Sequence, residues 1–526
     1  MRREFVIVSF VILAINAVSY FFFPWFLWSL VVFLPIIVIG TWDMLQDKHA
    51  ILKNFPIAGH FRYWLEMIRP EINQYFIESN QDGVPFSREQ RSLVYQRAKK
   101  QLDTLPFGTQ GDVYSVGYEW VNHSLAAKHN KEKDYRVVIG SDDCKKPYSA
   151  SIFNISAMSY GSLSKTAVLS LNAGAKIGGF AHNTGEGGIS PYHLEHGGDL
   201  IWQIGTGYFG CRTSKGDFCE ELFAKNSQQD SVKMIEIKLS QGAKPGHGGI
   251  LPAAKVTEEI SKIRNVPMGQ DVLSPPGHKA FHSPMGLLEF VKKLRELSGG
   301  KPVGFKLCLG RRSEFLAICK AMVESGITPD FITVDGGEGG TGAAPLEFSN
   351  HIGCPLREAQ IFVHNALVGF GVRDKIKLVV SGKVISGFDI ISRIAVGADL
   401  CYSARGMMLA LGCIQALRCN SNDCPSGVAT QKARFYKGVV VADKKERVAN
   451  YHKGTIHGVG EILGAMGLED PSELKPYHLV RRVAFNEIRH YGELYEYLQK
   501  GDLLGDNIPD SYKDAYERAQ VNSFAV

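Results

Sequence analysis

The chain begins with a long apolar run, because no charged residue occurs between Phe5 and Trp42. As a single helix this run would be about 57 Å long, at 1.5 Å per residue. A bilayer core is only about 30 Å thick. Two spans with a turn at Phe23-Pro24-Trp25 fit better, since a proline flanked by aromatic residues suits the membrane surface. The pattern predicts a transmembrane helical hairpin over residues 1–42.

Basic residues flank the hairpin on both sides. Arg2 and Arg3 precede the first span, and Lys48 and Lys53 follow the second. The positive-inside rule therefore predicts an anchor in the cytoplasmic membrane with the catalytic body in the cytoplasm. A signal peptide is the alternative, but the run is much longer than its apolar core of about 7–15 residues.

The next segment is predicted to be a helical linker or platform over residues 43–145. Glycine is rare up to about residue 107, and Leu65, Ile68 and Ile72 recur at helix-like spacings. The segment shows no candidate chemistry.

Short apolar runs alternate with helical stretches from about residue 146 to 450. This alternation predicts an α/β fold with a covered parallel sheet, most economically a (β/α)₈ TIM barrel. The candidate strands are Ile152–Met158, Met234–Leu239, Val303–Leu307, Phe331–Val334, Lys377–Ser381 and Leu400–Ser403. Residues 451–526 are predicted to form a polar, helical extension.

Composition and net charge exclude two classes of protein. The 526 residues are 45% apolar and 21% charged, which excludes a disordered chain, and the net charge of +6 is too small for a dedicated nucleic-acid binder. We therefore expect no nucleic-acid partner.

The last two candidate strands end in glycine-containing segments, Ser381-Gly382-Lys383-Val384 and Ser403-Ala404-Arg405-Gly406. Loops after strands seven and eight of such barrels commonly bind phosphate. The pair suits the phosphate of FMN, although many barrels bind phosphorylated substrates instead.

Two lysines, Lys238 and Lys306, each end an apolar strand. An ammonium there would stabilise the negative charge that develops on a reduced flavin. Alternatively, each lysine is paired with a neighbouring carboxylate such as Glu236 or Asp335.

The segment Gly205–Gly210 matches the dinucleotide fingerprint G-x-G-x-x-G. The residues that follow are a poor start for a helix, and no βαβ unit with a terminal acid is apparent. We therefore do not expect a nicotinamide site.

Three cysteines, Cys413, Cys419 and Cys424, lie within twelve residues, and Pro425 follows the last. This spacing resembles iron–sulfur ligation, and three ligands suit a three-iron cluster. Zinc with a distant fourth ligand such as His452, or three buried cysteines without a metal, remain alternatives.

Several motifs together resemble one family, the FMN-binding synthase domain of glutamate synthases. They occur in the family's order over more than half of the chain: Ser156–Ser162, Asn183–Gly188, Ile235–Lys238, Gln241–Gly246, Ser274–Pro276, Gly339–Ala343 and Cys419–Gln431.

The resemblance implies a barrel with FMN and a 3Fe-4S cluster that reduces 2-iminoglutarate, formed from 2-oxoglutarate and ammonia, to L-glutamate. It implies Cys413, Cys419 and Cys424 as cluster ligands, and Glu186, Lys244 and Arg264 as catalytic residues facing the substrate. The implied cofactor-binding residues are Met158, Ser159, Asn183, Lys238, Lys306, Gly336, Ser381, Gly382, Ser403 and Arg405.

The sequence departs from the family pattern in three ways. His247 and Ile250 stand where the family usually has Glu and Gln. Loss of an amide beside a dicarboxylate removes a hydrogen bond of about 0.5–1.5 kcal/mol, or about 1.5–3 kcal/mol to a charged acceptor. Met1-Arg2 also leads into the hairpin rather than a glutaminase domain, so ammonia or an amine is expected from elsewhere.

Three functions follow. The first is a membrane-anchored glutamate synthase-type reductase that takes electrons from a ferredoxin or a separate reductase. The second is an FMN oxidoreductase acting on another 2-oxo, 2-hydroxy or amino acid. The third is a membrane electron-transfer subunit.

Overall fold

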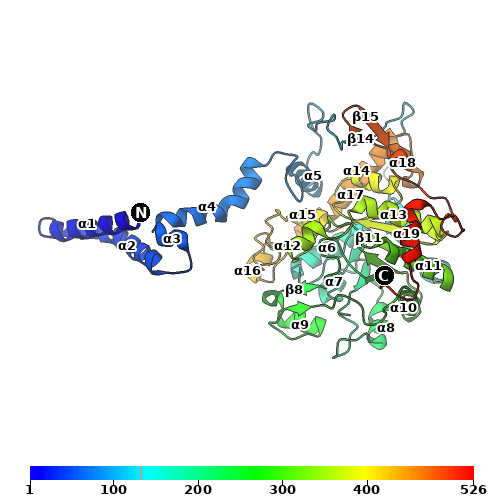
Figure 1. Cartoon of the computed structure of the whole chain (residues 1–526), viewed down its shortest axis with the longest axis horizontal. Helices are drawn as coiled ribbons and strands as arrows, with labels where there is room; N and C mark the ends of the chain where they lie inside the picture. Colours follow the sequence, from blue (N-terminus) through cyan, green and yellow to red (C-terminus); the bar gives the residue numbers. More distant parts are fainter. Residues whose placement is uncertain (131–132, 526) are drawn as a thin grey trace. The chain divides into compact units, whose positions relative to one another are not determined.

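The computed structural model describes residues 1–130 and 133–525. The chain forms two compact units, Met1–Arg88 and Glu89–Val526. Figure 1 shows the elements of both units along the chain.

The first unit contains a helical hairpin. Helices α1 (Arg2–Tyr20) and α2 (Leu30–Leu45) are joined by η1 (Pro24–Ser29), so the break falls at the predicted Phe23-Pro24 position. Close approach of the two helices requires Gly40, because a Cβ there would lie 2.2 Å from the ring of Phe5. Asn16 accepts a hydrogen bond from Ser29 Oγ at 2.6 Å, which satisfies polar groups inside an apolar unit.

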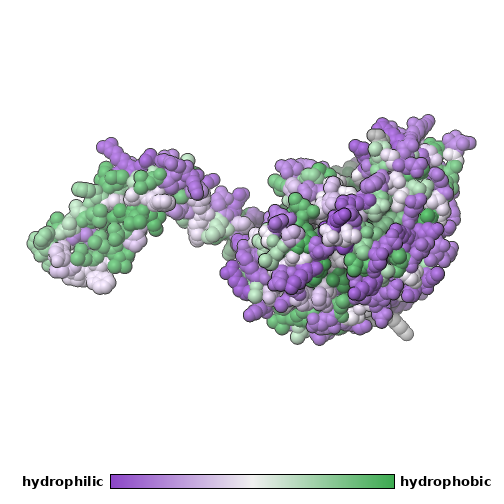
Figure 2. All heavy atoms as spheres, turned by 90° about the horizontal axis from the view of Figure 1, so that it is seen from below, coloured by the Kyte–Doolittle hydropathy of each residue, from purple (hydrophilic) through white to green (hydrophobic). Residues whose placement is uncertain are grey.

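The apolar side chains of the hairpin face outward, as Figure 2 shows. The stretches Arg2–Tyr20 and Pro24–Leu45 are each long and apolar enough to cross a bilayer, and little of either is buried. After the hairpin come α3 (Ala50–Asn54), α4 (Ala58–Ile72) and the π-helical turn η2 (Asn73–Ile77). Asp43, at the end of α2, accepts hydrogen bonds from the backbone N–H of Ile57 and from His60, and so fixes the start of α4.

In the described part of the second unit, eight parallel strands close into a barrel. The (β/α)₈ prediction is confirmed. The barrel strands are β4 (Phe153–Ile155), β5 (His182–Asn183), β6 (Leu200–Ile204), β7 (Val232–Lys238), β10 (Val303–Leu307), β11 (Phe331–Asp335), β12 (Lys377–Ser381) and β13 (Leu400–Ser403). Their side chains are almost all buried, as expected for parallel strands covered on both faces.

Helices cover the barrel and connect its strands (Figure 1). The longer ones are α6 (Lys165–Gly178), α8 (Glu220–Ser227), α10 (Pro284–Leu297), α11 (Arg312–Ser325), α13 (Leu356–Gly369), α14 (Gly387–Ala395) and α17 (Val441–Ala465). Local sequence sets their starts: Ser164 caps α6 by accepting from the Ala167 N–H, and Ser386 with Asp389 forms a capping box at α14.

Smaller elements lie in the segments that follow the barrel strands β5, β7, β11 and β13. They are α7 (Pro191–Leu194), β8 (Ile250–Leu251), η3 (Ala253–Lys255), α9 (Glu258–Arg264), β9 (Val272–Leu273), α12 (Leu346–His351), α15 (Arg405–Leu411) and α16 (Ala433–Tyr436). Strands β8 and β9 pair antiparallel, which holds the segment around Ile250 against the segment before Ser274.

Two regions differ from the helical expectation. After α5 (Arg88–Ala98), residues up to 145 contain β1 (Glu119–Val121) and β2 (Arg136–Ile139) rather than further helix. Beyond residue 450, β14 (Leu479–Ala484) pairs with both β1 and β15 (Glu487–His490). These strands are short and mix charged with apolar residues without a regular alternation, so the sequence shows no clear strand period.

The remaining elements lie outside the barrel. Strand β3 (Tyr148–Ser151) pairs antiparallel with β2, just before β4 enters the barrel. The others are η4 (Arg373–Lys375), η5 (Pro471–Glu473), η6 (Pro476–His478), α18 (Tyr491–Leu494) and α19 (Asp510–Arg518).

Candidate functional site

Strand pairing brings the predicted site residues to one end of the barrel. Lys238 on β7 lies beside Lys306 on β10, and Asp335 on β11 lies beside Ser381 on β12. Because parallel strands all end on the same face, these side chains and the loops that follow them surround one mouth.

The side chains of Glu186, Lys238, Lys244 and Arg264 form a compact charged group at this mouth. Lys238 Nζ lies 2.9 Å from Glu186 Oε1. Lys244 and Arg264 are 3% and 4% exposed, and both are close enough to Glu186 to interact with its charge. The carboxylate packs tightly, since a Cβ on Gly249 would lie 2.4 Å from Glu186 Oε1.

Electrostatics make this group cationic. Burial lowers the pKa of Lys244 to about 8, and the nearby Lys238 lowers it as well. Burial also lowers the pKa of Arg264 to about 10, against the attraction of Glu186. Burial alone would raise the pKa of Glu186, but Lys238, Lys244 and Arg264 outweigh it and hold that pKa below its usual value. At neutral pH three cations thus face one carboxylate.

Arg264 also holds the loop after β4. Its guanidinium donates to the Tyr160 carbonyl at 2.9 Å and to Ser159 Oγ at 3.2 Å. It lies over the ring of Phe209, 5.1 Å from the centroid. The Nε atom is buried and has no hydrogen-bond partner among the described residues. The arrangement leaves donor capacity for an anion in the mouth.

Asn183, one of the predicted cofactor-binding residues, is fully buried inside the barrel. Its amide donates to Glu236 at 3.0 Å, and its carbonyl accepts the Gly185 N–H at 3.0 Å. Gly185 has φ +64°, and a Cβ there would lie 2.6 Å from the backbone N of Ser159. Asn183 therefore shapes the turn that carries Glu186 next to Ser159.

Glu236 is the centre of a polar network in the barrel core. It accepts hydrogen bonds from Asn183, Gln203 at 2.6 Å and Thr333 at 2.9 Å. The negative charge of Glu236 also acts on Lys306 and helps to raise the pKa of that lysine. The sequence offered Glu236 as a possible partner for a strand-end lysine, but Lys238 pairs with Glu186 instead.

Lys306 is paired with Asp335, whose Oδ2 lies 3.3 Å from its Nζ, as the second alternative predicted. Burial lowers the pKa of Lys306, but Asp335 and Glu236 outweigh it and raise that pKa above its usual value. Lys306 therefore stays charged at the mouth at any physiological pH. The same Asp335 oxygen accepts the Gly242 N–H at 2.8 Å, which ties β11 to the segment before Lys244.

The ends of β12 and β13 hold the other predicted residues. Ser381 Oγ lies 3.3 Å from Ser156 Oγ, and Ser403 Oγ donates to the Val384 carbonyl at 2.6 Å. Arg405 donates to the Glu338 carbonyl at 2.8 Å. Gly336 and Gly382 flank this group on the neighbouring strand ends, and Met158 is buried in the loop after β4.

Lys383 is a candidate that the sequence reasoning left out. Burial and the neighbouring Arg405 both lower its pKa, so two cations lie close together after β12 and β13. Its place in the Ser381-Gly382-Lys383 loop was the available signal. Arg405 and Lys383 with the adjacent backbone suit a phosphate group.

The three cysteines lie near one another on the segment after α15. Burial is the main reason that the pKa of Cys413 is raised to about 12, and the thiolates of Cys419 and Cys424 contribute. Burial and Cys424 likewise raise the pKa of Cys419. Neighbouring thiolates that disfavour one another's charge are stabilised by a bound metal.

In residues 1–130 and 133–525, no three His, Cys, Asp or Glu side chains are arranged to hold a single metal ion. His452, the suggested fourth ligand, bonds to Ser151 Oγ at 3.0 Å and stacks on Phe180 at 4.0 Å between ring centroids. The zinc alternative with His452 is therefore wrong.

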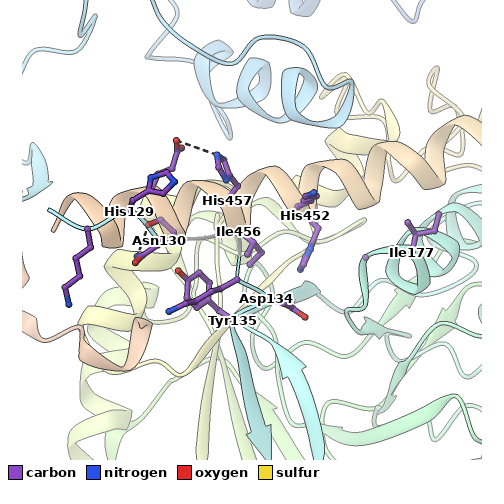
Figure 3. A pocket seen from close by; sticks show the side chains of 14 residues that line it. His129, Asn130, Asp134, Tyr135, Ile177, His452, Ile456 and His457 are labelled. Carbon is purple, nitrogen blue, oxygen red and sulfur yellow. Dashed lines mark hydrogen bonds and ion pairs between the residues drawn. The ribbon is translucent and has the colours of Figure 1, made fainter. Parts of the chain in front are cut away.

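His452 instead lines a cavity of about 610 Å³ (Figure 3). The cavity lies between α17, the end of α6 and residues 128–130 with 133–135. Tyr135 directly precedes β2, and Ser151, which bonds to His452, is the last residue of β3, two residues before β4. The cavity is therefore near the end where the barrel strands begin. None of the predicted site residues lines it.

The G-x-G-x-x-G segment follows β6, but α8 begins only at Glu220. No helix directly continues this described loop, so it lacks the strand–turn–helix geometry of a dinucleotide site. Gly205 instead packs against the side chain of Glu186.

Known proteins match most of the chain. Residues 118–469 match a family described as the conserved region in glutamate synthase. The glutamate synthase large subunit-like protein YerD of Bacillus subtilis is 38% identical over 490 residues, which is 85% of this chain and 93% of YerD. An archaeal glutamate synthase [NADPH] of Methanocaldococcus jannaschii is 36% identical over 335 residues, 63% of this chain and 62% of that protein.

The chain therefore spans about three fifths of the length of the archaeal enzyme that it matches. Among solved structures, a flavocytochrome b2 variant with bound sulfite covers 83% of this chain and 92% of its own, at 14% identity and a TM-score of 0.43. That likeness is too distant to bear on chemistry. The family match covers more than half of the sequence, and YerD matches nearly end to end. The chain belongs to the glutamate synthase family of oxidoreductases.

Proposed function

We propose that this protein catalyses the reductive amination of 2-oxoglutarate, through 2-iminoglutarate, to L-glutamate. The observation that carries the proposal is the cationic group at the barrel mouth, where Lys238, Lys244 and Arg264 outnumber the single carboxylate Glu186. A dicarboxylate such as 2-oxoglutarate would supply the negative charge that balances these three cations.

Lys244 and Arg264 are the proposed carboxylate ligands. Both are almost completely buried, so a substrate carboxylate would meet them with little competing water. Arg264 is already oriented by Ser159 and the Tyr160 carbonyl, which leaves less side-chain freedom to lose on binding.

Glu186 is the proposed group at the nitrogen. Its lowered pKa keeps it ionised at neutral pH, so it can accept a hydrogen bond or a proton from the amine. Lys238, at 2.9 Å, keeps this carboxylate in place.

FMN is the proposed cofactor, because Arg405, Lys383 and the Gly382 backbone fit a phosphate and Lys306 supplies a permanent charge at the mouth. When bound, FMN would supply the hydride that reduces the imine carbon. Met158, Ser159, Ser381, Ser403 and Gly336 belong to the surrounding wall. Asn183 would act indirectly, since it shapes the Gly185 turn from inside the barrel.

A 3Fe-4S cluster on Cys413, Cys419 and Cys424 is the proposed electron entry point. Three thiols, of which Cys424 is buried, lie close enough to act on one another's charge, and three thiolates are a ligand set that suits such a cluster. We propose a ferredoxin or a separate reductase as the donor, with ammonia or a delivered amine as the nitrogen source.

One observation favours a second candidate, an FMN oxidoreductase for a different 2-oxo, 2-hydroxy or amino acid. His247 and Ile250 stand where an acid and an amide are usual in the family. His247 packs edge-on against Phe348, with ring centroids 5.4 Å apart, and its Nδ1 lies 3.0 Å from the Gly248 carbonyl. With His247 and Ile250 in place of Glu and Gln, this segment is less polar than the family pattern implies.

Membrane anchoring by the hairpin is a further part of the proposal, with the catalytic body in the cytoplasm. The exposed apolar faces of Arg2–Tyr20 and Pro24–Leu45 support it, since such surface is costly in water.

Turnover tests the reaction directly. The detergent-purified protein, reduced anaerobically with dithionite, should be reoxidised by 2-oxoglutarate only when ammonium is present, and ¹⁵N-ammonium should appear in L-glutamate. Replacement Glu186→Gln should slow this step by about 10²–10⁴-fold without loss of FMN, because the proton acceptor is gone. Reoxidation by another acid but not by 2-oxoglutarate would support the second candidate and contradict the first.

Substrate affinity should depend on pH through Lys244. Its pKa of about 8 means that the ammonium is present below pH 8 and lost above it. The dissociation constant for 2-oxoglutarate, followed by flavin fluorescence, should therefore rise up to about tenfold per pH unit above pH 8. Lys244→Arg should remove this rise, because arginine keeps its charge. A constant affinity from pH 7 to 9.5 in the parent would be inconsistent with a charged Lys244 in binding.

Fractionation tests the anchor. The full-length chain should stay in the membrane pellet after alkaline carbonate washing, because its apolar helices cannot leave the lipid without exposing that surface to water. Added protease should digest the catalytic body in inverted vesicles but not in intact spheroplasts. Release of the whole chain by carbonate would show that the hairpin does not span the membrane.

A further inference from the structure

One short segment, residues 253–264, grips the loop after β4 at two points. Arg264, at its end, donates to the Tyr160 carbonyl at 2.9 Å and to Ser159 Oγ at 3.2 Å. Lys255, near its start, donates to the Ser162 carbonyl at 3.0 Å. The loop that carries the predicted flavin residues is thus held by two buried cations from the same piece of chain.

Lys255 also reaches the cysteine segment. Its Nζ donates to the Ala429 carbonyl at 2.9 Å, five residues beyond Cys424. Gln431 makes the reciprocal contact, because its amide donates to the Gly161 carbonyl at 3.0 Å and the Leu163 carbonyl at 2.8 Å. The loop after β4 and the segment after Cys424 are therefore tied together by side chains from both sides.

The charge of Lys255 has no ordinary partner. The residue is only 2% exposed, and among the residues that the structure describes it forms no ion pair with a carboxylate. The acidic groups whose charge acts on Lys255 are the thiols of Cys419 and Cys424, which are negative when they bind a metal. A buried cation without a counter-charge is costly, so its position beside these thiols calls for a negative centre there.

We propose that Lys255 is a positioning residue for the cysteine-bound centre, which holds the cysteine segment against the loop after β4 and stabilises the electron that the centre accepts. This inference rests on the proposed iron–sulfur assignment. An electron added to the centre increases its negative charge, and a fixed ammonium close by favours that state. The reduction potential of the centre is therefore higher with Lys255 than without it.

The test is an EPR-monitored redox titration of the detergent-purified, full-length protein with dithionite as the reductant. Lys255→Met keeps the apolar stem and removes the charge, and it should shift the midpoint potential of the iron centre to a more negative value. Lys255→Arg should stay close to the parent. Lys262→Met is the matched control on the same segment, because Lys262 is exposed and pairs with Glu258, and it should leave the potential unchanged.

Gln431→Leu tests the link between the loop after β4 and the cysteine segment, because it removes two hydrogen bonds and no charge. It should release iron to a chelator faster than the parent, with no shift of potential. A Lys255→Met protein that keeps its iron and shows the parental midpoint would overturn the charge role, and parental iron loss in Gln431→Leu would overturn the tie. A parent protein that contains FMN but no iron would refute the iron–sulfur assignment itself and leave the flavin site standing.

Discussion

An excess of buried positive charge at one end of the barrel is the constraint on which the rest of the structure depends. Lys238, Lys244 and Arg264 converge on the single carboxylate of Glu186, and the protein keeps them there although their burial opposes their charge. Such a group is tolerable only if an anion completes it. The proposed function supplies such an anion, because a dicarboxylate would bring two negative charges to the mouth.

The barrel makes this concentration of charge possible. Parallel pairing aligns the ends of β7 and β10, and the core carboxylate Glu236 anchors the strands from within through Asn183, Gln203 and Thr333. From the same mouth, the loop after β4 extends to the cysteine segment. The proposed substrate site, phosphate site and cysteine-bound centre would then act together, because buried hydrogen bonds fix the spacing of the loops that carry them.

The sequence predicted the strands that appear as apolar runs. It did not predict the short polar strand or the side-chain pairings, which leave no pattern in the sequence. Strands β10, β12 and β13 have the predicted bounds, since fully buried parallel strands appear as apolar runs. Strand β5 was missed because His182 and Asn183 are two polar residues with no pattern. The pairing of Lys238 with Glu186 joins positions far apart in sequence, so only the fold could distinguish it from the nearer Glu236. Lys255 gave no signal, because a lone lysine shows its partners only when the chain is folded.

The most direct test of the cationic mouth is a crystal structure of the anaerobically purified protein soaked with 2-oxoglutarate. We predict that the two carboxylates of the ligand lie against Lys244 and Arg264, with the 2-oxo carbon on the side of Glu186. A mouth that holds only water, with Lys244 turned to pair with Glu186 and no ligand at high occupancy, would contradict it.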